Sequence, residues 1–213
     1  SHTSCYTTET EEVEISLALV KPAGFNAFTD DSGAICYTAE ITYPATKENL
    51  LKKWEDFQLS NAADFAFHYS PYNFDSNPEA AYFEELLTKL NLTPDEVDDL
   101  YFTGALTSSN KTEFLVEYKD VSGKWRTYTP DFVVRRKDGK CLIVEIKKED
   151  AAIIADLERV EKGEMAYTTE GRKAAAIKRW EKLNPDRIKY QMITVKDDLP
   201  LNATDKASSF VKA

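Results

Sequence analysis

The sequence predicts an α/β fold, in which helices pack against a β-sheet. Two observations favour this class. The segments 77–90 and 169–183 carry helical patterns, and the segment 124–148 between them carries two apolar, β-rich runs around a turn signal. A further β-type run over 189–195 follows. The predicted order of elements is therefore helix, hairpin, helix, strand.

The segment KWRTYTPDFVVRRKDGKCLIVEIKK, residues 124–148, predicts a β-hairpin because Lys137-Asp138-Gly139-Lys140 is a strong turn signal between its two runs. Side chains alternate between the two faces of a strand, so Glu145 and Lys147 share one face and Ile146 lies on the other. Two apolar residues precede Glu145 on its face. The charged pair is therefore expected at the edge of a buried surface.

The length of the turn decides where Asp131 lies, because a shift of one residue moves every strand side chain to the opposite face. A two-residue loop, Asp138-Gly139, would set Phe132 opposite Glu145. A three-residue loop that also includes Lys137 would set Asp131 opposite Glu145. We predict the three-residue loop, with Gly139 left-handed. Pro130 lacks a ladder donor, so the first strand is expected to start or bend beside Asp131.

The first helical run opens with Asn77 as the expected cap and Pro78 at the first helical position, and it extends to Leu90. Its apolar stripe comprises Tyr82, Phe83, Leu86, Leu87 and Leu90. The sequence TEGRKAAAIKRWEKL predicts the second helix over 169–183, and KYQMITV predicts the strand over 189–195. These elements flank the hairpin on both sides in the sequence.

Two carboxylates with open coordination positions suit a hard, oxygen-preferring ion such as Mg²⁺, with Mn²⁺ as its expected substitute. Such a cation would polarise a phosphoryl oxygen and activate a water molecule. Lys147 could hold that water or offset the charge that develops at phosphorus. The pattern indicates metal-dependent hydrolysis of a phosphodiester.

The pair Pro130-Asp131, followed by Glu145-Ile146-Lys147, resembles the motif of the PD-(D/E)xK, or restriction-endonuclease-like, nuclease superfamily. The resemblance implies a core with a mixed central β-sheet flanked by helices over 71–200, an acidic N-terminal α+β extension over 1–70 and a C-terminal tail over 201–213. It also implies catalytic roles for Asp131, Glu145, Lys147 and Glu79, with Asp131, Glu145 and Glu79 as metal ligands. Glu84 and Glu85 are open alternatives to Glu79.

A narrower resemblance rests on FTGALT (102–107), EY (117–118), YTPDF (128–132), KDGK (137–140), VEIK (144–147) and EGRKAAA (170–176). These segments are similar to the C-terminal endonuclease domain of the Res subunits of type III restriction enzymes. That resemblance implies double-stranded DNA as substrate, and a helicase motor region and a modification (methyltransferase) subunit as partners. The chain has no G-x-x-x-x-G-K-[ST] phosphate loop, so we expect no ATP site in it.

The net charge of −10 argues against nucleic acid at first, because affinity for phosphates rests on Lys and Arg. The charge is uneven, however. Residues 1–110 hold 5 Lys and Arg against 19 Asp and Glu, whereas residues 111–213 hold 22 against 18. The basic residues thus accompany the motif. The candidates for DNA contact are Arg126, Arg135, Lys148, Arg172, Lys173 and Lys178, and a solvated helix face is the alternative for those on 169–183.

No run approaches the roughly 20 apolar residues that cross a bilayer, so a membrane is not an expected partner. The three cysteines, Cys5, Cys36 and Cys141, lack paired ligand spacing, which disfavours zinc and disulfides and favours the cytoplasm. In the N-terminal third we expect strands over 13–20 and 34–43, an amphipathic helix over 47–57 and an aromatic-rich connection over 60–73.

Two other classes of function remain open on the sequence alone. The first is a catalytically silent module of the same fold that binds DNA or a partner through the basic hairpin and helix. The second is an acidic adaptor that binds only protein. Asp131 could also be a strand-start aspartate in a turn, and Glu79 a first-turn acid favoured by the helix dipole.

Overall fold

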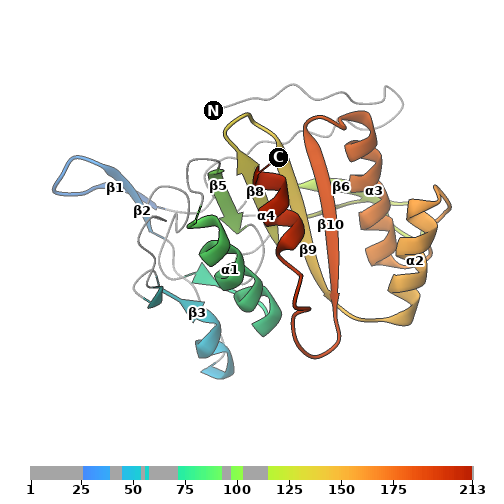
Figure 1. Ribbon diagram of the computed structural model, residues 1–213, viewed down its shortest axis with the longest axis horizontal. Helices are drawn as coiled ribbons and strands as arrows, with labels where there is room; N and C mark the ends of the chain where they lie inside the picture. The colour runs from blue at the N-terminus through green and yellow to red at the C-terminus, as the bar shows by residue number, and fades with distance from the viewer. Residues whose placement is uncertain are drawn as a thin grey trace.

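A four-stranded mixed sheet forms the centre of the computed structural model, which describes residues 26–38, 45–53, 56–57, 72–92, 97–102 and 115–212. The strand order is β10-β9-β8-β5, and the strands span Val97–Phe102 (β5), Phe132–Arg136 (β8), Cys141–Lys148 (β9) and Ile188–Val195 (β10). β8 runs antiparallel to β5 and to β9, whereas β10 runs parallel to β9. Figure 1 shows helices on both sides of this sheet, so the predicted mixed α/β architecture is confirmed.

The β8–β9 hairpin has the predicted register. Phe132 pairs with Val144, and the ladder continues to Arg135 and Cys141. The three-residue loop is closed by a hydrogen bond of 2.9 Å from the Arg136 N–H to the Lys140 carbonyl. Gly139 has φ +85°, the left-handed conformation that glycine adopts without strain. Extended by one residue, this register sets Asp131 against Glu145.

Two helices connect β9 to its parallel neighbour β10. The first, α2 (Ala151–Glu161), has Asp150 as its N-cap, whose side chain accepts the N–H groups of Ala152 and Ile153. The second, α3 (Thr169–Leu183), has the predicted bounds and begins after the cap Thr168. Parallel strands need such a long crossover, because a tight turn cannot return the chain to the same end of the sheet. The sequence pattern predicts no element over the residues of α2.

A buried aspartate joins the two crossover helices. Asp156 on α2 is fully buried, and its Oδ2 accepts the N–H groups of Tyr167 at 2.7 Å and Thr168 at 2.5 Å. Its Oδ1 accepts from the Arg159 side chain at 2.7 Å. Asp156 therefore satisfies backbone donors just before α3, and it fixes where that helix starts.

Close packing at this junction makes Gly171 sensitive to substitution. A Cβ at this position would lie 2.6 Å from Asp156 Oδ2 and 2.9 Å from the Ala166 Cβ. We expect Gly171→Ala to lower the free energy of unfolding by about 1–3 kcal/mol, because α2 and α3 would have to separate. Urea unfolding followed by circular dichroism measures this change. Lys182→Ala, at an exposed position of the same helix, should stay within about 0.5 kcal/mol, and equal stability of both variants would contradict the prediction.

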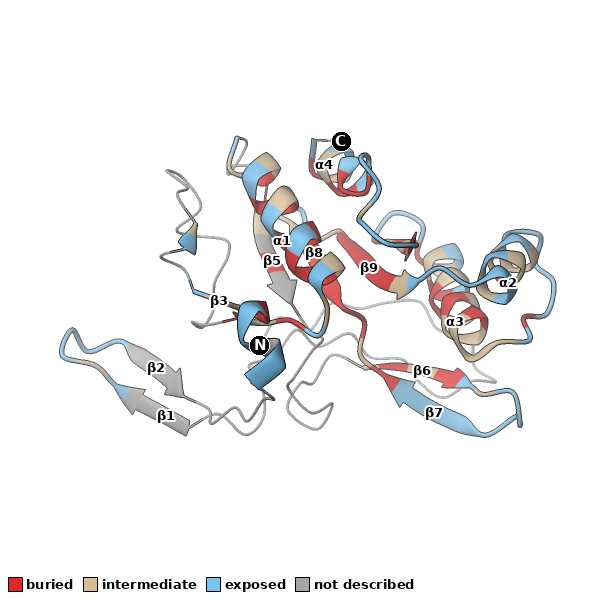
Figure 2. Cartoon of the chain, turned by 90° about the horizontal axis from the view of Figure 1, so that it is seen from below, coloured by how far each residue is buried: buried red, intermediate tan, exposed pale blue. Residues whose placement is uncertain are grey.

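The two faces of the central sheet carry separate hydrophobic clusters, because strand side chains alternate. One cluster joins the sheet to α1 (Asn77–Leu90) and includes Phe132, Val134, Leu142, Val144 and Ile146. The other joins the sheet to α3 and includes Val133, Cys141 and Ile143. Figure 2 shows the buried residues of β8 and β9 between these two layers. Each helix therefore covers one face, as this class of fold requires.

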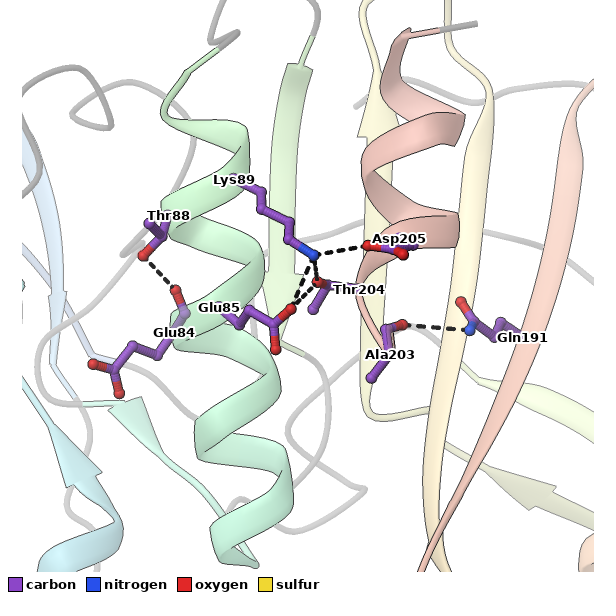
Figure 3. A network of polar contacts seen from close by, with 8 residues as sticks. All are labelled: Glu84, Glu85, Thr88, Lys89, Gln191, Ala203, Thr204 and Asp205. Carbon is purple, nitrogen blue, oxygen red and sulfur yellow. Dashed lines mark hydrogen bonds and ion pairs between the residues drawn. The ribbon is translucent and has the colours of Figure 1, made fainter. Parts of the chain in front are cut away.

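A short C-terminal helix, α4 (Asp205–Lys212), lies on the α1 face. Its Ala207 and Val211 are buried in the cluster that contains α1. Figure 3 shows the polar contacts beside it: Lys89 Nζ lies 2.9 Å from both Glu85 Oε1 and Asp205 Oδ1, and Thr204 Oγ1 donates to Glu85 Oε1 at 2.6 Å. The segment 201–213, expected as a tail, thus contains a helix that packs on the core.

A second hairpin precedes β8 and lies on the α3 side of the sheet. It pairs β6 (Val116–Lys119) with β7 (Trp125–Tyr128), and β6 packs against α3. Asp120 closes its turn by accepting the N–H groups of Ser122 at 2.8 Å and Lys124 at 3.0 Å. The chain passes from the end of β7 directly to Asp131, so this hairpin borders the candidate site.

The N-terminal third is described only in part. A hairpin pairs β1 (Asn26–Thr29) with β2 (Ile35–Thr38), which covers the beginning of the strand expected over 34–43. The helix expected over 47–57 is wrong, because the chain forms a 3₁₀-helix, η1 (Ala45–Leu50), and then β3 (Leu51–Lys52), which pairs with β4 (Tyr72–Asn73). Residues 13–20 and 58–71 lie outside the described residues. In the described part of the chain, no helix has the length and hydropathy to span a membrane.

Candidate active site

The β8–β9 hairpin brings Asp131, Glu145 and Lys147 together at one end. Asp131 directly precedes β8, is 8% exposed, and its Oδ2 accepts the N–H of Ile146 on β9 at 2.7 Å. This bond crosses between the two strands beside Glu145. The backbone of β9 therefore holds the carboxylate of Asp131. This hydrogen bond fixes the direction of the Asp131 side chain more strictly than strand pairing alone.

Glu145 and Lys147 form an ion pair on the face of β9 that turns toward α3. Lys147 Nζ lies 2.9 Å from Glu145 Oε1, and Glu145 is only 1% exposed. The other carboxylate oxygen, Glu145 Oε2, is buried and accepts no hydrogen bond from the described residues. A buried carboxylate oxygen without a donor is costly unless a proton or a cation neutralises it.

Burial destabilises the charged forms of both carboxylates. Burial, and then the charge of Asp131, raise the pKa of Glu145 to about 7. Burial also raises the pKa of Asp131, although Lys147 and the Ile146 N–H act in the opposite direction. Burial alone would lower the pKa of the Lys147 ammonium, but the charges of Glu145 and Asp131 outweigh it and hold that pKa above its ordinary value. Lys147 is therefore a permanent cation in this site.

Glu79 reaches the same electrostatic environment from α1. Burial, and then the charge of Asp131, raise the pKa of Glu79 to about 7. Both of its carboxylate oxygens have partners, since Oε1 accepts from Ser76 Oγ at 2.8 Å and Oε2 accepts from the Asp75 N–H at 3.1 Å. Ser76 is the N-cap of α1, so the expectation that Asn77 caps this helix is wrong. Glu79 thus combines a capping role with a position near Asp131.

Two tyrosines that sequence analysis did not assign to the site border it. Burial, and then the charges of Glu145 and Asp131, raise the pKa of Tyr190 on β10. Tyr128 at the end of β7 is buried as well, and neither hydroxyl has a hydrogen-bond partner among the described residues. The parallel pairing of β10 with β9, which brings Tyr190 to this face, has no local signal in the sequence.

Four of the candidate DNA-binding residues are paired with acidic side chains: Lys173 Nζ lies 3.8 Å from Glu170 Oε1, and three others have closer partners. Arg126 Nε lies 2.9 Å from Asp120 Oδ2, within the β6–β7 hairpin. Arg135 forms an ion pair with Asp98 of β5. Lys178 Nζ lies 2.9 Å from Glu161 Oε1 and 3.4 Å from Glu181 Oε2. Their positive charges are partly neutralised within the protein.

Lys173 and the other two candidates differ in their surroundings. Lys148 is exposed at the end of β9. Lys173 Nζ lies 5.1 Å from the centroid of the Tyr128 ring, and its charge acts on both Asp131 and Glu145. Arg172 is half-buried, and its Nε has no acceptor among the described residues. Lys173 is therefore a candidate contact whose charge reaches the two carboxylates.

The donor set at this site fits a hard divalent cation. Asp131 and Glu145 supply carboxylate oxygens, and Glu145 Oε2 has no donor among the described residues. Burial, and then the charge of Asp131, raise the pKa of Glu145, and a bound cation would offset both effects. Glu79 fits less well as a ligand, because both of its oxygens accept hydrogen bonds at its own helix terminus. Within the described ranges, no group of three His, Cys, Asp or Glu side chains is already gathered as a metal site.

The mixed sheet, the helices on its two faces and the acidic and lysine residues at one end of the hairpin define an α/β domain of restriction-endonuclease-like fold. In agreement with this class, residues 108–196 match the family model described as TnsA-like endonuclease N terminal. The match covers less than half of the chain, and it contains Asp131, Glu145 and Lys147 but not Glu79. No curated protein and no solved structure gives a significant match.

The match supports a nuclease domain and the predicted restriction-endonuclease-like superfamily. It gives no support to the narrower resemblance to type III Res subunits. The family similarity and the geometry both point to the β8–β9 hairpin. The hairpin is therefore the part of the chain on which a functional proposal can rest.

Proposed function

We propose that this chain is a metal-dependent deoxyribonuclease that hydrolyses a DNA phosphodiester at the end of the β8–β9 hairpin. The observation that carries the proposal is the pair of buried carboxylates, Asp131 and Glu145, beside the half-buried Lys147, with Glu145 Oε2 unpartnered among the described residues. The match of residues 108–196 to a TnsA-like endonuclease model supports the same reaction class. Double-stranded DNA is the proposed substrate.

The residues take distinct roles in this proposal. Asp131 and Glu145 would hold Mg²⁺, or Mn²⁺ in its place, with Glu79 as a supporting carboxylate. The bound ion would supply Lewis-acid chemistry at the phosphate and lower the pKa of a water molecule. Asp131 is oriented by the Ile146 N–H. Glu145 Oε2 is the oxygen free to take either the cation or a proton.

Lys147 acts as a fixed positive charge. Its pKa is held above the ordinary value by Glu145 and Asp131, so it does not accept a proton from water at neutral pH. It instead orients the attacking water and offsets the negative charge that grows on the phosphate oxygens. Its ion pair with Glu145 fixes the position of the ammonium before any substrate binds.

The type III assignment is a finer form of this proposal. In that form the chain would be the nuclease part of a Res subunit in a restriction-modification system, working in the cytoplasm with a helicase motor region and a methyltransferase subunit. It rests on the short segments 102–107 and 170–176 together with the motif. Cleavage that requires ATP and a modification subunit would support it, and cleavage by the chain alone would favour a freestanding nuclease.

A catalytically silent module of the same fold is the second candidate, and one observation favours it. Two of the charged groups already have partners within the protein, since Lys147 is paired with Glu145 Oε1 and Glu79 is bonded at its own helix terminus. Such a module would retain DNA in EDTA and would show no cleavage under any metal condition.

Nicking of supercoiled plasmid tests the enzymatic proposal directly. We expect the purified chain to convert supercoiled plasmid to the nicked or linear form with Mg²⁺ or Mn²⁺, and to leave it intact in EDTA. Asp131 and Glu145 provide negative charge that suits a divalent cation. The proposed nucleophile is a water molecule that this cation activates, so cleavage should stop when EDTA removes the cation. Gel electrophoresis of a time course measures the conversion. Equal conversion in EDTA would contradict metal dependence. No conversion with either metal would leave two alternatives, the silent module and a nuclease domain that needs its motor and partner subunits.

A further inference from the structure

A groove of about 220 Å³ lies between the β6–β7 hairpin and α3, on the face of the sheet that carries Glu145. We call it the hairpin–helix groove. Its lining includes three cations, two aromatic rings and one carboxylate, which are Lys119, Arg172, Arg179, Tyr118, Trp125 and Glu117. In a chain of net charge −10, this surface has an excess of positive charge.

The groove presents an aromatic ring beside cations. Trp125 is 40% exposed, which is unusual for a large apolar side chain, and Lys119 Nζ lies 4.8 Å from its ring centroid. On the opposite wall, Arg172 has a buried Nε with no acceptor among the described residues. A cationic groove with an accessible aromatic ring matches a nucleotide, whose phosphate pairs with the cations and whose base stacks on the ring.

The groove continues to the candidate active site through a chain of contacts. Tyr118 lines the groove, and its ring packs edge-to-face on Tyr128 at 5.6 Å between centroids. Lys173 lies 5.1 Å from the centroid of Tyr128, and its charge acts on Asp131 and Glu145. Arg172 and Lys173 are adjacent on α3, so cations follow one another from the groove toward the carboxylates.

We infer that the hairpin–helix groove binds an unpaired segment of the DNA strand next to the phosphate to be cleaved. Arg172 and Arg179 bind its phosphates, and Trp125 stacks on one of its bases. A base within a duplex has both faces covered by its neighbours, so only an unpaired base can lie on Trp125. The inference rests on the proposed nuclease function and adds a substrate feature to it, a single-stranded or frayed region beside the scissile bond.

Binding in EDTA separates this inference from the chemistry. The probes are a fluorescein-labelled 20-nucleotide oligo(dT) and a blunt 20-base-pair duplex, followed by fluorescence anisotropy at low salt. We expect Trp125→Ala to weaken oligo(dT) binding by about 5- to 100-fold, the range for loss of one stacked base, and duplex binding much less. Trp125→Phe keeps a ring and should retain most of the affinity.

The arginines provide a second readout, which a merely structural role would not change. Arg172→Ala or Arg179→Ala should lower the slope of log affinity for oligo(dT) against log salt by about 0.7 for each phosphate that the variant no longer binds. Arg187→Ala is the matched control, because Arg187 is exposed beyond α3 and does not line the groove. Circular dichroism confirms that each variant is folded.

The outcomes are distinct. Selective loss of oligo(dT) affinity in Trp125→Ala, with rescue by Trp125→Phe, supports the inference. Unchanged oligo(dT) binding in the groove variants, or an equal loss in Arg187→Ala, overturns it. If the wild type cleaves plasmid, and the groove variants bind oligo(dT) and cleave plasmid as the wild type does, the inference fails and the proposed function stands. If the groove variants lose oligo(dT) but no metal gives cleavage, the proposed function fails and the groove stands as a binding site.

Discussion

Replacing Lys147 by alanine is expected to lower metal-dependent plasmid cleavage by about 10²- to 10³-fold, the usual loss when one preorganised electrostatic contact to the transition state is removed. Lys147 is a fixed cation 2.9 Å from Glu145, and nothing else described at the hairpin end offers the same charge at the same place. Asp131→Asn should have an effect at least as large, because the amide keeps the shape of the side chain and loses the charge that suits a cation.

Two further variants bracket this loss. Lys182→Ala removes an exposed lysine of α3 that lies outside the site and should leave cleavage within about twofold, since surface charges are screened. Glu79→Gln should lie between the two, because Glu79 is also committed to the start of α1. A Lys147→Ala protein that is folded and still cleaves like the wild type would place the active site elsewhere.

Glu145→Gln is expected to stabilise the metal-free protein at pH 8 by about 1–3 kcal/mol while it abolishes cleavage. Burial and the charge of Asp131 raise the pKa of Glu145 from 4.5 to about 7 in the folded state. Each unit of difference corresponds to about 1.4 kcal/mol. The folded state therefore binds the proton of the Glu145 carboxyl group more tightly than the unfolded state does. The stabilisation that this proton gives to the folded state is complete below pH 4.5 and is lost as the pH rises to about 7. A neutral glutamine removes that loss.

Urea unfolding in EDTA at pH 5 and pH 8 measures this effect. The stability of the wild type should fall between these values, and that of Glu145→Gln should fall less, with the remaining slope due to Glu79, whose pKa is raised to the same region. Added Mg²⁺ should stabilise the wild type at pH 8 and should have little effect on Glu145→Gln, because ligands stabilise the state that binds them. A destabilised Glu145→Gln at pH 8 would show that the carboxylate charge is well accommodated without metal.

Local signals in the sequence were sufficient for the parts of the fold that depend on nearby residues. The helix bounds at 77–90 and 169–183 follow from apolar spacing, and the three-residue turn ending at Gly139 is one of the two turns that its residues allow. The pairing of Leu51–Lys52 with Tyr72–Asn73, which replaced the expected helix, depends on a partner about twenty residues away. Local helix propensity contains no information about such a distant partner. In this segment the tertiary strand pairing outweighs the local helix propensity.

The site was foreseen only in part for the same reason. Asp131, Glu145 and Lys147 belong to one hairpin, so alternation and register placed them together. Tyr190 lies on β10, which joins the sheet only after a crossover of two helices. The sequence pattern predicts no helix at the first of these, α2. The capping of α1 by Ser76 changes the surroundings of Glu79 through a one-residue difference in the position of the cap. Differences of that size lie within the normal uncertainty of helix ends.

The turn at residues 137–139 constrains how this chain can vary during evolution. Exposed loop tips usually tolerate insertions and deletions, because little packs against them. Here the insertion or deletion of a single residue, unless a bulge absorbed it, would move Asp131 to the face opposite Glu145, although the turn lies at the other end of the hairpin. Among active descendants of this sequence, we expect the length of the turn to change by two residues at a time.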